Sequence, residues 1–169
     1  MNFIYDYQTN NSNAAITVIQ NIISILGNTI FIIAFLAVVH IITYRKMYTI
    51  VYLIYITINA YLIAVEKQAY HDPRPFHSNQ LIQSLEWSCP RSFGFPSGHS
   101  WIAILLYEPF LSDIVGTKTN RYLLWITIKS TGVLIPLSRL YLGSHSTDQI
   151  TSGLLHSISF LILYKFFFQ

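Results

Sequence analysis

Long apolar stretches alternate with short polar segments along the whole chain. Five stretches approach or exceed the roughly 20 apolar residues that a helix needs to cross a lipid bilayer, and they cover residues 15–43, 47–65, 98–114, 122–136 and 148–167. The first is longer than a bilayer requires, so we expect one tilted helix or a helix with an interfacial extension. The pattern predicts an all-α integral membrane protein, a helical bundle of about five transmembrane helices.

Polar residues and prolines mark the connections between these stretches. Residues 68–97 carry four prolines and predict a loop with a short surface helix, while residues 113–121 predict a turn. We find neither an internal repeat nor a low-complexity linker, so residues 1–169 are expected to form a single domain. Residues 1–13 are polar and lack the basic start of a cleavable signal, so we expect the first apolar stretch to serve as an uncleaved anchor.

Composition and charge support the membrane assignment. The chain is 53% hydrophobic and only 10% charged, which is unsuited to a water-soluble globule. The net charge of +3 comes without the clustered basic face of a nucleic-acid binder, so we expect no nucleic-acid partner. Cys89 is the only cysteine, which excludes an intramolecular disulfide and a thiolate cluster.

Three short clusters carry the candidate chemistry. They are Lys67 with Arg74-Pro75, then Pro96-Ser97-Gly98-His99, then Ser138-Arg139 with His145. With five spans, the second helix ends, the third begins, the fourth ends and the fifth begins at the same membrane face. We therefore expect all three clusters to meet in an active site at that face.

The residue types in these clusters suit a phosphoryl group. Arg74 and Arg139 each offer a planar fork of donors that matches phosphate oxygens, and Lys67 adds a point charge. Ser97 and the amide of Gly98 lie where a helix is expected to begin, and unsatisfied amides there attract anions. The clusters therefore predict a phosphate-binding site.

The clusters resemble the three motifs of the type-2 phosphatidic acid phosphatase family, a membrane group that shares its site with vanadium haloperoxidases and glucose-6-phosphatase. Lys, six residues and Arg-Pro match residues 67–75, Pro-Ser-Gly-His matches residues 96–99, and Ser-Arg, five residues and His match residues 138–145. The resemblance covers residues 67–153 and implies a hydrolase that works through a phosphohistidine, without a metal or other cofactor.

The same resemblance implies the catalytic roles. It makes His145 the nucleophile and His99 the acid that protonates the leaving oxygen. The family usually has Asp four residues after the third-motif histidine, whereas this chain has Gln149, and Asp148 stands one residue early, about 100° away around a helix. Either Asp148 reaches His145 through an irregular helix start, or the enzyme works with Gln149. The spacing of His99, His145 and Asp148 matches no known metal signature.

Simpler interpretations apply to several of these residues. Ser97 is also a common type of helix cap, and His40 and His156 fall in apolar segments where we expect packing roles. Glu108 and Lys129 fall inside predicted spans, where charges are costly and usually paired. We expect these two residues to form an ion pair between neighbouring antiparallel helices.

Flanking charges predict the orientation. The face opposite the motifs carries most of the cations outside them, namely Arg45, Lys46, Lys118, Arg121 and Lys165. The positive-inside tendency therefore places the site on the non-cytoplasmic side, and the glycosylation sequon at residues 10–12 lies on that side too. This favours the endoplasmic reticulum or another endomembrane, with the site facing the lumen.

The first functional hypothesis is a membrane phosphatase acting on a lipid phosphate monoester or diphosphate, with membrane lipids around it. The alternative is a catalytically weak or inactive family member that serves as a structural subunit of a larger membrane complex. The short chain, about five spans where the family core has six, and the displaced aspartate favour the alternative; retention of the cations and both histidines favours the enzyme. Oxidation chemistry with bound vanadate is a third option, which the membrane setting disfavours.

Overall fold

The protein is described from a computed structural model that covers residues 2–10, 13–42, 46–87, 91–109 and 121–168. These ranges contain eight helices: α1 (Asn2–Asn10), α2 (Ala14–Ile25), α3 (Thr29–Ile42), α4 (Lys46–Tyr70), α5 (Pro75–Ser78), α6 (Gly98–Pro109), α7 (Arg121–Tyr141) and α8 (Thr147–Phe168). The predicted all-α class is confirmed.

Several helices are long and apolar enough to cross a membrane. Two helical segments, Thr49–Ser78 and Thr147–Phe167, meet this criterion alone, and the bent pair Ala14–Ile25 and Thr29–Val38 adds a third if it counts as one span. The other two predicted spans correspond to α6 and α7, which do not meet it within the described residues. Large apolar side chains such as Ile41, Ile54 and Phe166 are exposed on these helices, as expected for lipid-facing surfaces.

The first apolar stretch is not one continuous helix, so the expectation of a single tilted helix over residues 15–43 is wrong. The chain bends by 58° between α2 and α3. At the break, Gly27 N and Asn28 N donate to carbonyls three residues back, at 3.0 and 2.9 Å, which closes α2 with a tight turn. The side chain of Asn28 then accepts from Ile30 N at 2.9 Å and caps the start of α3.

Other bounds differ less. The polar residues 1–13, for which no helix was expected, include α1, and Gln8 of α1 donates to the carbonyls of Gln83 and Tyr141 at 2.9 Å each. The predicted short surface helix is α5. The predicted span 122–136 continues through Pro136 to Tyr141, so the third motif begins inside the last turn of α7 rather than after it.

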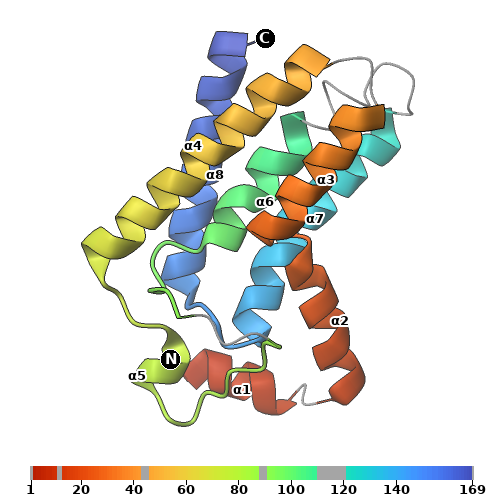
Figure 1. Ribbon diagram of the computed structural model, residues 1–169. Helices are drawn as coiled ribbons and strands as arrows, with labels where there is room; N and C mark the ends of the chain where they lie inside the picture. Colours follow the sequence, from red (N-terminus) through yellow and green to blue (C-terminus); the bar gives the residue numbers. More distant parts are fainter. Residues whose placement is uncertain (1, 11–12, 43–45, 88–90, 110–120, 169) are drawn as a thin grey trace.

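Helix α6 lies at the centre of the bundle and packs against α7 and α8 (Figure 1). Its Trp101 is fully buried and donates from Nε1 to Asn59 Oδ1 of α4 at 3.1 Å. His156, expected to pack, stacks on Trp101 with ring centroids 4.4 Å apart, and its Nε2 also lies 3.3 Å from Glu66 Oε1. These contacts join α4, α6 and α8 around one apolar core.

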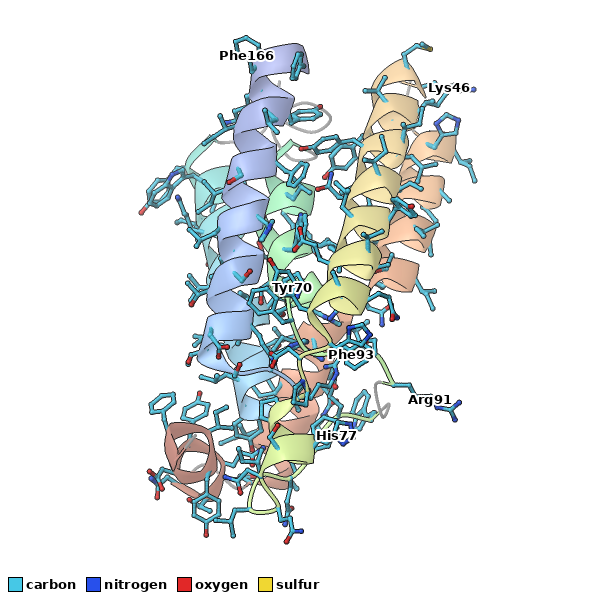
Figure 2. The ribbon with its side chains drawn as sticks, turned by 90° about the vertical axis from the view of Figure 1, so that its left-hand side faces the viewer. Lys46, Tyr70, His77, Arg91, Phe93 and Phe166 are labelled. Carbon is cyan, nitrogen blue, oxygen red and sulfur yellow. The ribbon has the colours of Figure 1, made fainter. Side chains whose placement is uncertain are left out.

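Helix direction decides where the motifs lie. Helices α4 and α7 run toward the end of the bundle that carries α1 and α5, whereas α6 and α8 run away from it, as Figure 1 shows. Lys46 and Phe166 mark the opposite end in Figure 2. The ends of α4 and α7 and the starts of α6 and α8 therefore meet on one side, as the sequence predicted.

Helices α6 and α7 are neighbours, with Gly132 of α7 facing Ile104 of α6. Lys129 is exposed, and its ammonium lies 5.8 Å from the ring centroid of Trp125. The side chain of Glu108 lies outside the described residues, so the Glu108–Lys129 ion pair stays a prediction.

Candidate active site

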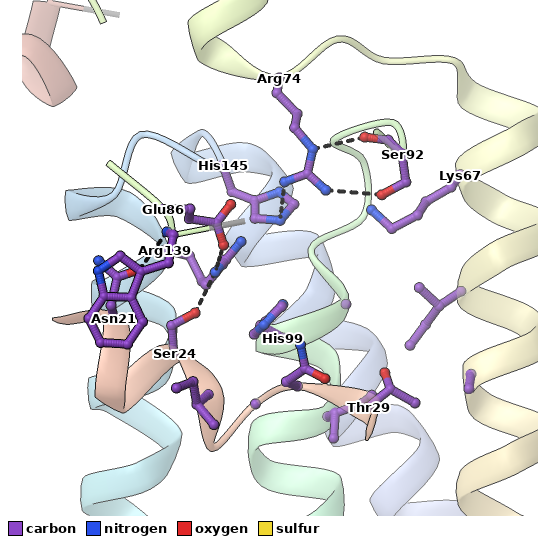
Figure 3. A pocket seen from close by; sticks show the side chains of 18 residues that line it. Asn21, Ser24, Thr29, Lys67, Arg74, Glu86, Ser92, His99, Arg139 and His145 are labelled. Carbon is purple, nitrogen blue, oxygen red and sulfur yellow. Dashed lines mark hydrogen bonds and ion pairs between the residues drawn. The ribbon is translucent and has the colours of Figure 1, made fainter. Parts of the chain in front are cut away.

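The helix ends surround one cavity of about 310 Å³. Its lining includes Lys67 in the last turn of α4, His99 in the first turn of α6, Arg139 in the last turn of α7, Arg74 just before α5, and His145 in the turn between α7 and α8 (Figure 3). Gly98 also lines it. Three cations and two imidazoles predicted from separate motifs thus share one cavity.

Arg74 is the most connected of the three cations. Its Nε and Nη2 donate to the carbonyl and hydroxyl of Ser92 at 2.8 and 3.1 Å, and its Nη1 donates to Ser144 O at 3.0 Å. The same Nη1 lies 3.2 Å from His145 Nε2. Because a guanidinium can only donate, Nε2 of His145 accepts in this contact.

Lys67 is held by the loop that precedes α6. Its ammonium donates to Phe93 O at 2.7 Å and to Gly94 O at 3.4 Å. Residues 92–94 therefore accept from both Lys67 and Arg74, and they fix these two cations at the edge of the cavity.

Arg139 forms an ion pair that the motifs did not predict. Its Nη1 contacts Glu86 Oε1 and the hydroxyl of Ser24, and the Glu86 side chain is only 8% exposed. Asn21 of α2 positions the segment around Glu86, since it donates to Leu85 O and accepts from Trp87 N, both at 3.0 Å. Helix α2 and the 85–87 segment thus complete the wall of the cavity (Figure 3).

His145 is buried, with 1% exposure, and its two ring nitrogens have different partners. Nδ1 lies 3.1 Å from Gln149 Oε1. Since Nε2 accepts from Arg74, Nδ1 carries the proton and donates to Gln149. Burial, followed by the positive charges of Arg139, Arg74 and Lys67, holds the pKa of His145 well below its usual range. His145 is therefore a neutral imidazole whose Nε2 lone pair faces the cavity.

Three of the predicted site residues lie outside the cavity lining. Ser97 is buried, and its hydroxyl accepts from the amide and hydroxyl of Ser100 at 3.4 and 2.9 Å, as a cap of α6. Gln149 stands behind His145, whereas Asp148 is exposed and lines a neighbouring pocket. The geometry therefore puts Gln149, not Asp148, against the imidazole.

The motifs missed Asn21, Ser24, Glu86 and Ser92, which line the cavity, and Asp72, whose carboxylate accepts from Gln149 Nε2 at 2.6 Å. They lie on α2 or in loops and match no motif, and only the fold brings them to the site. Within the described residues, no three His, Cys, Asp or Glu side chains form a group that could hold a metal ion.

Comparison with known proteins agrees with this architecture. One solved structure, described as the first transmembrane PAP2 type phosphatidylglycerolphosphate phosphatase from Bacillus subtilis, aligns with a TM-score of 0.81 over 97% of this chain and 82% of that chain, at 20% identity. At that identity the likeness establishes the fold. No curated protein matches the chain. A family model described as the PAP2 superfamily matches residues 48–169. The chain therefore belongs to the PAP2 superfamily, and at the level of that family it is an integral membrane phosphatase.

Proposed function

We propose that the protein hydrolyses a phosphate monoester or diphosphate of a membrane lipid through a phosphohistidine on His145. The observation that carries this proposal is the meeting of Lys67, Arg74, Arg139, His99 and His145 in one cavity at the ends of apolar helices. A phosphoryl group needs charge stabilisation on its equatorial oxygens and a positioned nucleophile. This cavity contains groups able to supply both.

Substrate binding requires an exchange of partners. Arg74 and Lys67 now donate to carbonyls of the 92–94 segment, and Arg139 is paired with Glu86. Phosphate oxygens would take over donors of Arg74 and Lys67, because a hydrogen bond between a cation and a dianion is stronger than one between a cation and a neutral carbonyl. Arg74 would then release Nε2 of His145 for attack.

The first chemical step forms the covalent intermediate. The lone pair on Nε2 of His145 attacks phosphorus, an N–P bond forms, and the bond between phosphorus and the leaving oxygen breaks. The leaving oxygen takes the proton of His99, whose protonated form a bound phosphate dianion favours. The lipid leaves as an alcohol, or as a monophosphate if the substrate was a diphosphate.

The second step regenerates the enzyme. A water oxygen attacks the phosphorus of the phosphohistidine while neutral His99 accepts a proton from that water. The N–P bond breaks, its electron pair returns to Nε2, and inorganic phosphate is released.

A lipid substrate fits the position of the cavity. The cavity lies at the ends of helices whose outer surfaces are apolar, so a substrate could keep its tail in the bilayer while its phosphate reaches the cations. Suitable substrates are phosphatidic acid, lysolipid and sphingoid phosphates, and polyprenyl diphosphates. According to its description, the Bacillus subtilis neighbour acts on phosphatidylglycerolphosphate. This lipid completes a panel of candidate substrates.

Phosphate release tests the proposal. Purified protein in detergent should release phosphate from at least one lipid of the panel in the presence of a chelator. His145→Ala should abolish release, whereas His77→Ala, at an exposed histidine of α5, should leave it unchanged. With a substrate labelled on phosphorus, alkaline quenching should leave label on the wild type and none on His145→Ala. No release from any lipid would favour the structural-subunit alternative.

A further inference from the structure

We propose that Asp72 is a positioning residue for this reaction, because its carboxylate fixes the amide of Gln149 in the orientation that presents an acceptor to His145 Nδ1. The inference rests on the proposed function, in which His145 is the nucleophile. Asp72 stands five residues after Lys67 and belongs to none of the predicted site positions.

The hydrogen bonds of Gln149 define its orientation. Its Nε2 donates to Asp72 Oδ2 at 2.6 Å and to Pro73 O at 3.0 Å. Its Oε1 faces His145 Nδ1 at 3.1 Å and accepts from Ser146 N at 3.2 Å. Two acceptors on the nitrogen side and two donors on the oxygen side leave only one orientation of the amide that satisfies every partner.

The Asp72 carboxylate and the Pro73 carbonyl form the side of this arrangement that cannot adapt. A carboxylate and a backbone carbonyl only accept, so a flipped amide would point its oxygen at two acceptors and its NH₂ at the imidazole N–H. Gln149 is 2% exposed, and water is therefore poorly placed to relieve such a mismatch. Together with Arg74 at Nε2, Asp72 thereby favours the His145 tautomer that carries its proton on Nδ1.

The surrounding backbone holds the arrangement in place. The carbonyl of Asp72 accepts from Gly94 N at 2.7 Å. A methyl group added at Gly94 would collide with the amide of Gln149. The segment that holds Lys67 thus also covers Gln149, and it links Asp72 to the cavity.

The charge of Asp72 also bears on catalysis. When the N–P bond forms, the imidazole of His145 becomes positive, and a nearby carboxylate stabilises that charge. A glutamine alone offers only a dipole. Here the Asp72 carboxylate does not touch the imidazole. It contacts the amide of Gln149, and Gln149 contacts His145.

A double-mutant cycle tests the inference. Asp72→Ala should lower kcat about ten- to a hundredfold with little change in KM, the range typical of groups that orient a reacting side chain through an intermediate partner. Gln149→Ala should lower kcat at least as much. Because Asp72 acts through Gln149, the double variant should match Gln149→Ala. Asp6→Ala, at an exposed aspartate of α1, is the matched control and should retain full activity.

A charge exchange provides the rescue. Gln149→Asp alone places two carboxylates side by side and should be impaired. Adding Asp72→Asn removes the repulsion and leaves one carboxylate against Nδ1, so the double variant should regain kcat above either single change. Additive losses from Asp72→Ala and Gln149→Ala, or a loss on Asp148→Ala that exceeds the loss on Asp72→Ala, would overturn the inference.

A spectroscopic readout separates this inference from the proposed function. In protein labelled with ¹⁵N-histidine, the His145 signals, assigned by their disappearance in His145→Gln, should show the Nδ1-protonated tautomer, and Asp72→Ala should shift the population toward the other tautomer. Such a shift in a protein that releases no phosphate would refute the proposed function alone. An active protein whose tautomer and kcat do not respond to Asp72→Ala would refute the inference alone.

Discussion

At the scale of single residues, His145 combines burial with a crowd of positive charge. These two causes hold its pKa well below the ordinary value, whereas in an unfolded chain a histidine titrates near pH 6.5. Below about pH 6.5 the unfolded chain takes up a proton that the folded protein refuses, so the folded state loses stability as pH falls. The loss from this group accumulates with each pH unit in the window between the two pKa values.

Thermal unfolding in detergent measures this effect. Lowering the pH from about 7.5 to 5.5 should reduce the Tm of the wild type more than that of His145→Gln, which lacks the titrating ring. The difference between the two proteins isolates His145 from all other titrating groups. Equal pH dependence in both would show that His145 keeps its ordinary pKa in the folded protein.

The motifs predicted the cations and the histidines of the cavity, but not the contacts among them. Lys67, Arg74, His99, Arg139 and His145 were all found by residue type and spacing, and all line the cavity. Their partners are backbone carbonyls and side chains far away in sequence, such as Asp72, which lies 77 residues from Gln149. Spacing along one chain carries no signal for such a pair, because any acidic residue of the loop would fit the same pattern.

At the scale of elements, the break between α2 and α3 shapes the floor of the site. A Cβ on Gly27 would lie 2.8 Å from Ile135 Cγ2 and 2.9 Å from His99 Cδ2, closer than side-chain atoms normally approach. Gly27→Ala should therefore push His99 out of position and lower kcat about tenfold or more, since small misplacements of a reacting group are costly. Phosphate release at saturating substrate measures the loss.

Gly132→Ala is the matched control for this change. Gly132 lies within helix α7, and a Cβ there would meet only the side chain of Ile104, at 3.2 Å. It should fold and keep kcat close to the wild-type value. If the two alanine variants had the same activity, the contact between Gly27 and His99 would have no part in positioning the acid.

Most helices were predictable from the sequence, whereas the break between α2 and α3 was only partly predictable. Apolar length predicted α4 and α8, and the Pro-Ser-Gly signal located the start of α6 at Gly98. The run Gly27-Asn28-Thr29 combines a helix-ending residue with capping residues and could have located the break. The prediction for residues 15–43 rested on apolar length alone. Because the residues before and after this break are mostly apolar, the hydropathy along the chain does not reveal where the helix is interrupted.

At the scale of the whole molecule, the alternation of helix directions brings three motifs to one side. Counting spans was enough to predict this, because an odd number of crossings between two points reverses the face and an even number restores it. The tight packing of α8 on α6 and the closure of the cavity by α2 were not predictable. They depend on side-chain shape rather than on hydropathy.

The same arrangement makes the orientation testable. Arg91 is exposed on the motif side, and Lys46 is exposed at the opposite end of the bundle (Figure 2). With Cys89→Ser as background, a membrane-impermeant maleimide applied to sealed vesicles of known sidedness should label Arg91→Cys from the lumenal side and Lys46→Cys from the cytoplasmic side. The physical reason is the excess of Lys and Arg at the Lys46 end, which favours retention in the cytoplasm. Labelling of Arg91→Cys from the cytoplasmic side would place the cavity there, and a lipid phosphate in the cytoplasmic leaflet would then be the substrate to test.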